Sequence, residues 1–187
     1  MQEDIDLALE AAEEGMQNSI VHFQRELIKI RSGKASPQMV ADVKVEYYGM
    51  PTPLNQVAGI KTTDARTLVI QPFEKKMVPV VEQALYGANL GITPQSDGEV
   101  VRMVVPPLTE ERRKQLVKQA SGFAEDAKVS IRNARRDAIQ DVKAAVKEGY
   151  PEDAGKRSEQ TVQELTDKYS KQVDSIFAKK EEELMTV

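Results

Sequence analysis

The chain has 187 residues, of which 40% are hydrophobic and 30% are charged, a balance that supports a buried core and is not that of a disordered protein. It contains no cysteine, which excludes a disulfide framework, a thiolate metal site and a cysteine nucleophile. The net charge of −4 argues against a protein that coats nucleic acid generally.

The first predicted element is a long N-terminal helix. The opening residues are acidic and are not a secretory signal, and no stretch approaches the roughly 18 apolar residues of a membrane helix, so we expect a cytoplasmic protein. Apolar residues then recur at spacings of three, four and seven, which predicts a helix over residues 4–30. Those residues are Leu9, Ala12, Met16, Phe23, Leu27 and Ile30. Arg31, Ser32 and Gly33 interrupt the pattern.

A small α/β module is predicted to follow, over residues 31–105. Its first strand is indicated by Val43, Val45 and Tyr47, which alternate with polar residues. Further β-branched segments suggest strands at 57–62, 67–71 and 100–105, and one helical segment, 75–86, lies among them. Most of the prolines fall in this region, where turns are needed.

Two more long helices are predicted after the module. Thr109 is a suitable N-cap, and the two glutamates that follow it complement the helix dipole in the first turn. A helix should therefore begin there and end near Gly149. A final helix carries Val162, Leu165, Tyr169, Val173, Ile176 and Leu184. Three such helices bury their apolar stripes most simply as an antiparallel three-helix bundle of residues 1–30 and 106–187, which makes the fold class α+β. The two crossings to the inserted module form a natural hinge at Arg31, Ser32, Gly33, Val105, Pro106 and Pro107.

No motif in the chain predicts catalysis. His22 is the only histidine, so a histidine-rich metal site cannot form, and a structural or solvent role is expected for it. Phosphate-binding, dinucleotide-binding and nucleophile-elbow motifs are missing. The glutamates at 13–14 and 181–183 are adjacent on helices and point in different directions, as in solvated faces. We therefore expect no enzyme, no metal and no cofactor.

The strongest functional signal lies on the second long helix. Residues 112–147 hold ten Lys/Arg and four Asp/Glu, and nine of those cations fall within an arc of roughly 160° on a helical wheel. The cations are densest at Lys128, Arg132, Arg135 and Arg136. The apolar stripe is centred about a quarter-turn or more away, so one face packs in the bundle while a neighbouring face is cationic.

Two features of this cationic face favour nucleic acid over a merely solvated surface, which remains the alternative. Asp137 and Asp141 lie mostly on the other side of the wheel, so we expect the arginines to lack local acidic partners. Arginine rather than lysine suits bidentate contacts with phosphates. The face has no aromatic residue on which bases could stack, which favours recognition of folded RNA by its backbone and shape.

Several stretches of the chain resemble the ribosome recycling factor family. They are Ile30-Arg31-Ser32-Gly33-Lys34-Ala35-Ser36-Pro37, then residues 45–54, 106–114, 131–137 and 180–185, and so extend over essentially the whole chain in order. The most specific are Pro-Pro-Leu-Thr-Glu-Glu-Arg-Arg, from Pro106, and Arg-Asn-x-Arg-Arg-Asp, from Arg132.

The resemblance implies an L-shaped two-domain protein, a three-helix bundle with a small β/α/β domain. It implies ribosome recycling after termination: the bundle binds the large ribosomal subunit across the space that tRNA would use. The post-termination complex is then split, releasing mRNA and tRNA, with elongation factor G and the GTP bound to that partner. Arg113, Arg132 and Arg135 match the family's contacts with ribosomal RNA. Residues 31–105 would face the elongation factor. Lys34 stands where the family commonly has arginine, so bidentate geometry would be lost there.

Two alternative functions remain open at this point. A helical scaffold without an RNA role would need apolar residues on the outer faces of the bundle, where we expect charged residues and no spare apolar stripe, as in a monomer. A general RNA chaperone should be basic overall, whereas this chain is acidic.

Overall fold

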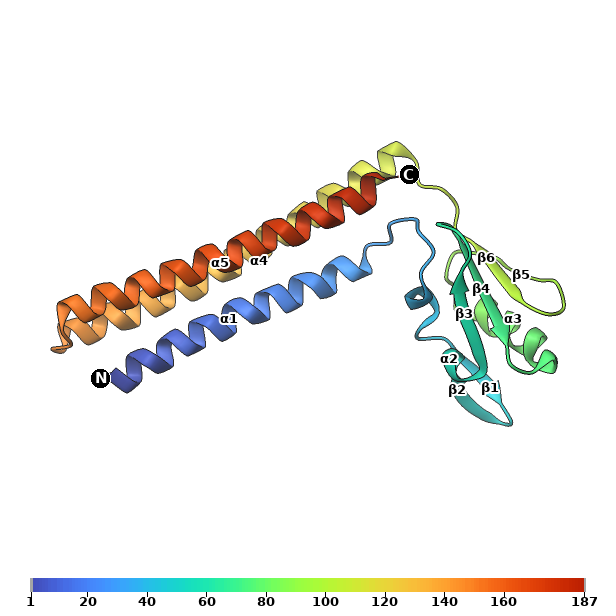
Figure 1. Cartoon of the computed structure of the whole chain (residues 1–187), viewed down its shortest axis with the longest axis horizontal. Helices are drawn as coiled ribbons and strands as arrows, with labels where there is room; N and C mark the ends of the chain where they lie inside the picture. Colours follow the sequence, from blue (N-terminus) through green and yellow to red (C-terminus); the bar gives the residue numbers. More distant parts are fainter. Residues whose placement is uncertain (1, 187) are drawn as a thin grey trace. The chain divides into compact units, whose positions relative to one another are not determined.

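The computed structural model describes residues 2–186, which form two compact units joined by two chain crossings (Figure 1). One unit, here called the bundle, ends its first segment at Ser32 and resumes at Glu110; the small unit extends from Gly33 to Thr109. Both changes of unit fall a few residues later in the chain than the expected boundaries at 30/31 and 105/106. The mixed α+β class is confirmed.

Three long helices form the bundle: α1 (Gln2–Lys29), α4 (Glu110–Lys147) and α5 (Glu152–Met185). A short connection reverses the chain between α4 and α5, with Gly149 at a φ of +107°, and α1 lies beside both of them (Figure 1). Tyr150 in this connection donates a hydrogen bond of 2.8 Å to Gln2 at the start of α1. The predicted three-helix bundle is therefore confirmed.

Apolar residues at helical spacing fill the bundle core, and several positions of α4 are occupied by small residues. Fully buried examples are Ile5, Met16, Phe23, Ala120, Ile131, Val142, Val162 and Val173. A Cβ placed on Gly15 of α1 would lie 3.6 Å from the Cβ of Ala134 on α4. Beside it, the Ser19 hydroxyl lies 2.8 Å from both the Gly15 carbonyl oxygen and the Ser130 hydroxyl. Small side chains thus allow α1 and α4 to pack closely.

A four-stranded antiparallel sheet is the main layer of the small unit. Its strands, in the order β3-β4-β6-β5, are β3 (Ala58–Thr62), β4 (Thr67–Pro72), β6 (Val101–Val104) and β5 (Pro94–Ser96). Leu68 and Ile70 alternate with more exposed residues on β4, as Val101 and Met103 do on β6. These four side chains share one apolar core with residues of α3 (Val78–Gly87).

A separate hairpin and two short helical segments complete the small unit. The hairpin pairs β1 (Lys44–Tyr47) with β2 (Met50–Pro53), and α2 (Leu54–Val57) follows it. A 3₁₀ segment, Pro37–Val40, precedes the hairpin. Neither β2 nor β5 is predicted from the sequence, since β2 contains two prolines and β5 begins with one. Proline cannot donate to a sheet ladder and is tolerated in such edge strands.

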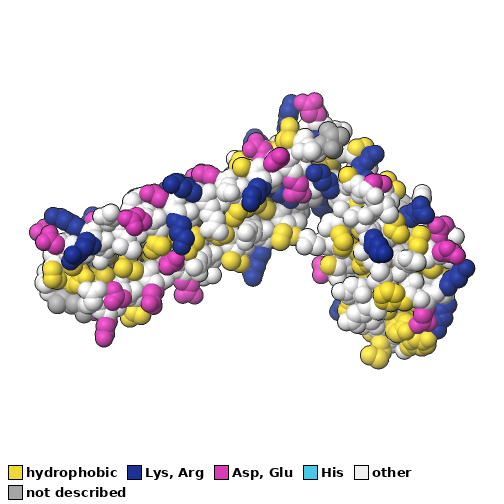
Figure 2. Space-filling view, in the orientation of Figure 1, with side chains coloured by type: hydrophobic (Ala, Val, Ile, Leu, Met, Phe, Trp, Pro, Cys, Tyr) yellow, Lys and Arg dark blue, Asp and Glu magenta, His cyan; other side chains and the backbone are white. Residues whose placement is uncertain are grey.

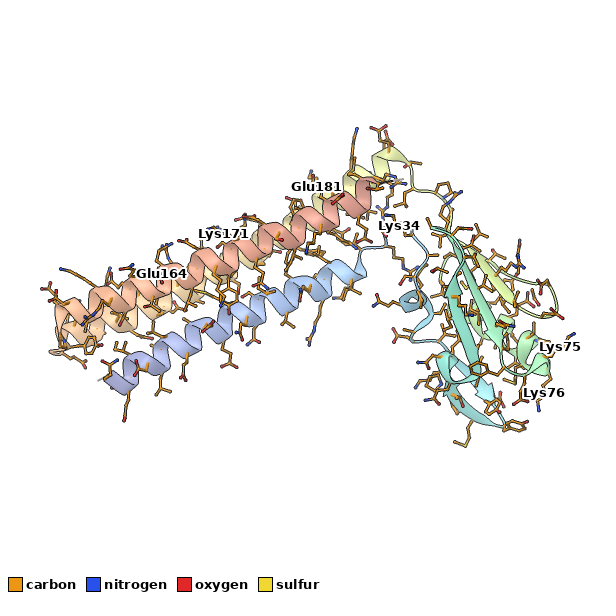
Figure 3. All side chains as sticks on the ribbon, viewed as in Figure 1. Lys34, Lys75, Lys76, Glu164, Lys171 and Glu181 are labelled. Carbon is orange, nitrogen blue, oxygen red and sulfur yellow. The ribbon has the colours of Figure 1, made fainter. Side chains whose placement is uncertain are left out.

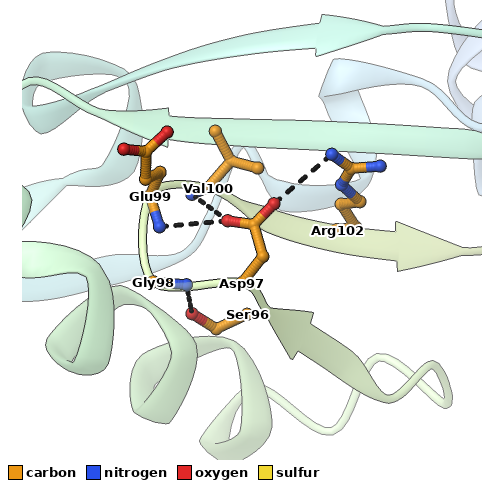
Figure 4. A network of polar contacts seen from close by, with 6 residues as sticks. All are labelled: Ser96, Asp97, Gly98, Glu99, Val100 and Arg102. Carbon is orange, nitrogen blue, oxygen red and sulfur yellow. Dashed lines mark hydrogen bonds and ion pairs between the residues drawn. The ribbon is translucent and has the colours of Figure 1, made fainter.

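The turn between β5 and β6 is held by a polar network (Figure 4). The Asp97 carboxylate accepts hydrogen bonds from the backbone N–H groups of Val100 and Glu99, at 2.9 and 3.0 Å, and pairs with Arg102 at 3.3 Å. The two backbone N–H groups are the main cause of a lowered pKa at Asp97, because they stabilise its charged form. This side chain therefore fixes the turn that sets the β5–β6 register.

Gly33, at the first crossing, has no room for a side chain. Its φ is +74°, and a Cβ built there would lie 2.8 Å from Cγ of Leu108. We expect Gly33→Ala to lower the free energy of unfolding by about 1–3 kcal/mol, since it adds both left-handed strain and a steric overlap. Urea unfolding followed by circular dichroism measures the change.

Leu108→Ala is the matched control for this prediction. In the double variant the overlap is gone but the positive φ remains, so part of the loss caused by Gly33→Ala should disappear. If the double variant loses as much free energy of unfolding as the two single variants together, the steric explanation is contradicted.

Candidate nucleic-acid interface

Four cations predicted from the sequence lie together on α4 and are here called the cationic cluster: Lys128, Arg132, Arg135 and Arg136. Arg132 and Arg136 are exposed, whereas Lys128 and Arg135 are partly buried. The four lie within nine residues of a continuous helix, 128–136, or about 12 Å along its axis. One rigid element therefore holds all of them, so their spacing is set before any ligand arrives.

The expectation that these cations lack acidic partners is wrong. Arg132 Nη2 lies 2.7 Å from a carboxylate oxygen of Glu125, and Lys128 Nζ lies 2.6 Å from a carboxylate oxygen of Asp174 on α5. Arg136 Nε lies 3.6 Å from Asp137. The expectation counted Asp137 and Asp141 but not Glu125, which lies seven residues, or about two turns, before Arg132 on the same side of α4. Asp174 comes from another helix and is not visible on a wheel of α4.

The ion pairs of Arg132 and Arg136 are largely exposed to solvent. The side chains of Arg132 and Glu125 are 53% and 61% exposed, and both members of the Arg136–Asp137 pair are 66% exposed. Exposed pairs contribute only about 0–1 kcal/mol, so a phosphate can replace the carboxylate at small cost. The two exposed arginine pairs can therefore exchange their carboxylates for an anion.

Arg135 is the most constrained member of the cluster. Its Nη1 donates a hydrogen bond of 3.0 Å to Oε1 of Gln163 on α5. Its Nε is a buried nitrogen that has no hydrogen-bond partner among the described residues. A guanidinium has five N–H donors, so this side chain is oriented by one contact and keeps donors for an anion.

Arg113 lies at the other end of α4 and is not part of the cluster. Its Nη1 donates hydrogen bonds of 2.9 Å to the carbonyl oxygens of Leu184 and Thr186. The last carbonyl groups of a helix have no partner within it, and a cation there complements the helix dipole. Arg113 thus closes the end of α5, at about 28 Å along α4 from Arg132. The structure does not bring this predicted contact residue together with the other four.

The contribution of α5 to this surface is not predicted by the sequence. Because Gln163 and Asp174 contact α4 cations, neighbouring positions on the same side of α5 border the cluster. Lys171 is three residues before Asp174 and Lys156 is seven before Gln163, spacings that share a helix side. Both lysines are exposed, and Figure 3 labels Lys171 on α5. Only the pairing of the two helices identifies them, since they lie far from the cluster in sequence.

The outer face of α1 is not purely charged, contrary to expectation. Leu7, Val21 and Ile28 are 63%, 44% and 66% exposed. They are separated by fourteen and seven residues, or about 21 and 10 Å along the helix, and so do not form a continuous stripe. Isolated apolar residues of this kind are common on protein surfaces and do not support a scaffold that binds a partner helix.

His22 is exposed and lines a groove of about 410 Å³ between α1 and α4. Glu26 and Asp126 share the lining, which makes the groove acidic and unsuited to phosphate. No group of three or more potential metal-binding side chains occurs in residues 2–186. None of the helices described here is both long and apolar enough to cross a membrane.

The chain is similar to ribosome recycling factors in sequence. The family model described as ribosome recycling factor matches residues 23–185. The ribosome-recycling factor of Flavobacterium psychrophilum is 50% identical over 187 residues, covering 100% of both chains. That of Porphyromonas gingivalis is 50% identical over 173 residues, covering 92% of this chain and 93% of that one.

The fold is similar to two solved structures. One is the solution structure of a ribosome recycling factor, with a TM-score of 0.79, 35% identity and 98% of each chain covered. The other is the Thermus thermophilus ribosome recycling factor in models that also contain elongation factor G of Escherichia coli bound to the post-termination complex. It has a TM-score of 0.63 and 37% identity, with 97% of this chain and 99% of that one covered.

Proposed function

Because this chain belongs to the ribosome recycling factor family, it recycles ribosomes after termination, and we propose that its bundle does so by docking on RNA of the large subunit. The observation that carries this docking mode is the cationic cluster on α4. Its arginines are exposed or keep free donors, and they are fixed on one rigid helix. That geometry suits the regularly spaced phosphates of folded RNA.

The role proposed for the chain needs no catalytic group. Elongation factor G hydrolyses GTP and so supplies the energy for splitting, while this chain supplies a rigid bundle and a small unit on which the motor can act. The 38 residues of α4 extend over about 57 Å, so the bundle is a long rod. We place the protein in the cytoplasm, as a monomer, together with the ribosomes that it recycles.

The two units are proposed to have separate tasks. The bundle holds the large subunit, and the small unit faces elongation factor G, the protein named beside the Thermus thermophilus relative. Residues Arg31 to Gly33 and Val105 to Pro107 form the crossings between them and are proposed as the hinge. Lys34, partly buried just beyond the first crossing, carries a charge but not the bidentate geometry of arginine (Figure 3).

Sedimentation with purified large subunits at increasing salt tests the RNA-docking proposal. If three or four cations neutralise phosphates, the logarithm of the association constant should fall with the logarithm of salt concentration with a slope of roughly −2 to −4. Arg132→Gln and Arg135→Gln should each reduce the slope by about 0.7–0.9. An affinity that does not change with salt would overturn the assignment of this surface.

A further inference from the structure

The β1–β2 end of the small unit carries an exposed apolar patch, which the cationic cluster of the bundle does not explain. Tyr48, Met50 and Phe73 are 72%, 68% and 71% exposed. They are among the most exposed large hydrophobic side chains of the described residues. Figure 2 shows hydrophobic side chains gathered at this end of the small unit. Clustered exposed side chains of this kind mark an interaction site.

Glu74 organises the patch by tying the hairpin to the segment that follows β4. The Tyr47 hydroxyl donates a hydrogen bond to Oε1 of Glu74, and Lys76 Nζ lies 2.9 Å from its Oε2. Lys76, which is labelled in Figure 3, also sits 4.5 Å from the ring centroid of Tyr48. The rings of Tyr47 and Tyr48 meet edge to face, with centroids 4.6 Å apart. These contacts therefore orient Tyr48 before any partner binds.

Tyr48 occupies a backbone conformation that disfavours it. Its φ is +49° and that of Gly49 is +79°, as in the two-residue hairpin turn that prefers asparagine followed by glycine. A tyrosine at the first position is strained, because its Cβ approaches the backbone. The strained residue also presents its ring to solvent, where it gains little from burial. Strain at an exposed aromatic residue indicates a role outside the folding of the unit.

The charges around the patch indicate a protein partner. Charges of both signs lie near the patch: Lys44 and Glu46 are on β1, Glu74, Lys75 and Lys76 directly follow Phe73, and Glu99 pairs with Lys75. Lys75 and Glu99 lie 3.6 Å apart. A nucleic-acid surface needs an excess of cations to neutralise phosphates. Protein interfaces instead combine tyrosine, phenylalanine and methionine at their centre with a mixed polar rim.

We propose that Tyr48, Met50 and Phe73 are the anchor by which the small unit binds an apolar pocket of elongation factor G. This rests on the proposed function, which makes that factor the protein partner of the small unit. Aromatic anchors dominate the affinity of such interfaces. The Glu74 network holds Tyr48 in place, so binding loses little side-chain freedom.

Two variants test the anchor without endangering the fold. Tyr48→Asn installs the residue that the turn prefers, so its melting temperature should stay equal or rise. Met50→Ser with Phe73→Ser removes the other two exposed side chains. Ribosome splitting is measured with GTP at increasing concentrations of elongation factor G. For each variant, the concentration of elongation factor G that gives half-maximal splitting should rise by roughly tenfold or more. Tyr86→Ser, at a 55% exposed aromatic on α3, is the matched control and should behave as the native chain does.

The outcomes separate this inference from the proposed function. If the native chain binds large subunits but the two variants need no more elongation factor G for splitting than the native chain does, the proposed anchor is contradicted. If the variants instead lose affinity for large subunits when elongation factor G is absent, the patch contacts the ribosome and the inference is overturned. Failure of the native chain itself to support splitting would contradict the proposed function.

Discussion

The double variant Arg132→Glu with Arg135→Glu should bind large ribosomal subunits more weakly by about 3–6 kcal/mol, or roughly 10²–10⁴-fold. Each arginine would lose a charged hydrogen bond to phosphate, at about 1.5–3 kcal/mol, and each glutamate adds repulsion. The effect should exceed that of either single variant, since both side chains belong to one surface of α4.

A second double variant, with two charges reversed elsewhere on the chain, controls for the change in net charge. Lys61→Glu with Arg66→Glu changes two exposed residues of the small unit and alters the net charge by the same amount. This variant should bind large subunits as the native chain does. Circular dichroism should show intact helices in both variants, because surface substitutions change stability little. Equal binding losses in the two variants would mean that overall charge, and not the α4 surface, governs docking.

A disulfide across the two crossings should abolish splitting by elongation factor G while large-subunit binding stays unchanged. One cysteine would replace a residue between Arg31 and Gly33, and the other a residue between Val105 and Pro107, at a pair with Cα atoms within about 7 Å. The native chain has no cysteine that could form a competing disulfide. The locked crossings would prevent the small unit from moving when the factor acts on it, whereas the cationic cluster remains unaltered.

Reduction of the disulfide provides the internal control. Adding a reductant should restore splitting to the level of the two single-cysteine variants. Splitting by the oxidised protein at the native rate would show that motion at the crossings is dispensable, and the small unit would then act as a fixed handle.

The sequence alone predicted the elements whose patterns are local. Apolar spacing indicated α1, α4 and α5, and α4 begins at Glu110, directly after Thr109. Alternation at Val43 to Tyr47 likewise indicated β1. These patterns are readable because helix and strand periodicities follow from backbone geometry. The same periodicity placed four cations on one side of α4. Where prolines hid the alternation, in β2 and β5, the reading failed.

Only the tertiary structure decided what surrounds those side chains. Asp174 reaches Lys128, and Gln163 orients Arg135, because α5 packs against α4. Arg113 is occupied by the end of α5 for the same reason. No spacing rule on one helix predicts such contacts, since the partners are separated by long stretches of chain and meet only after packing. The sequence therefore determined which residues share a face, and the packing of the helices determined which of them remain available to bind.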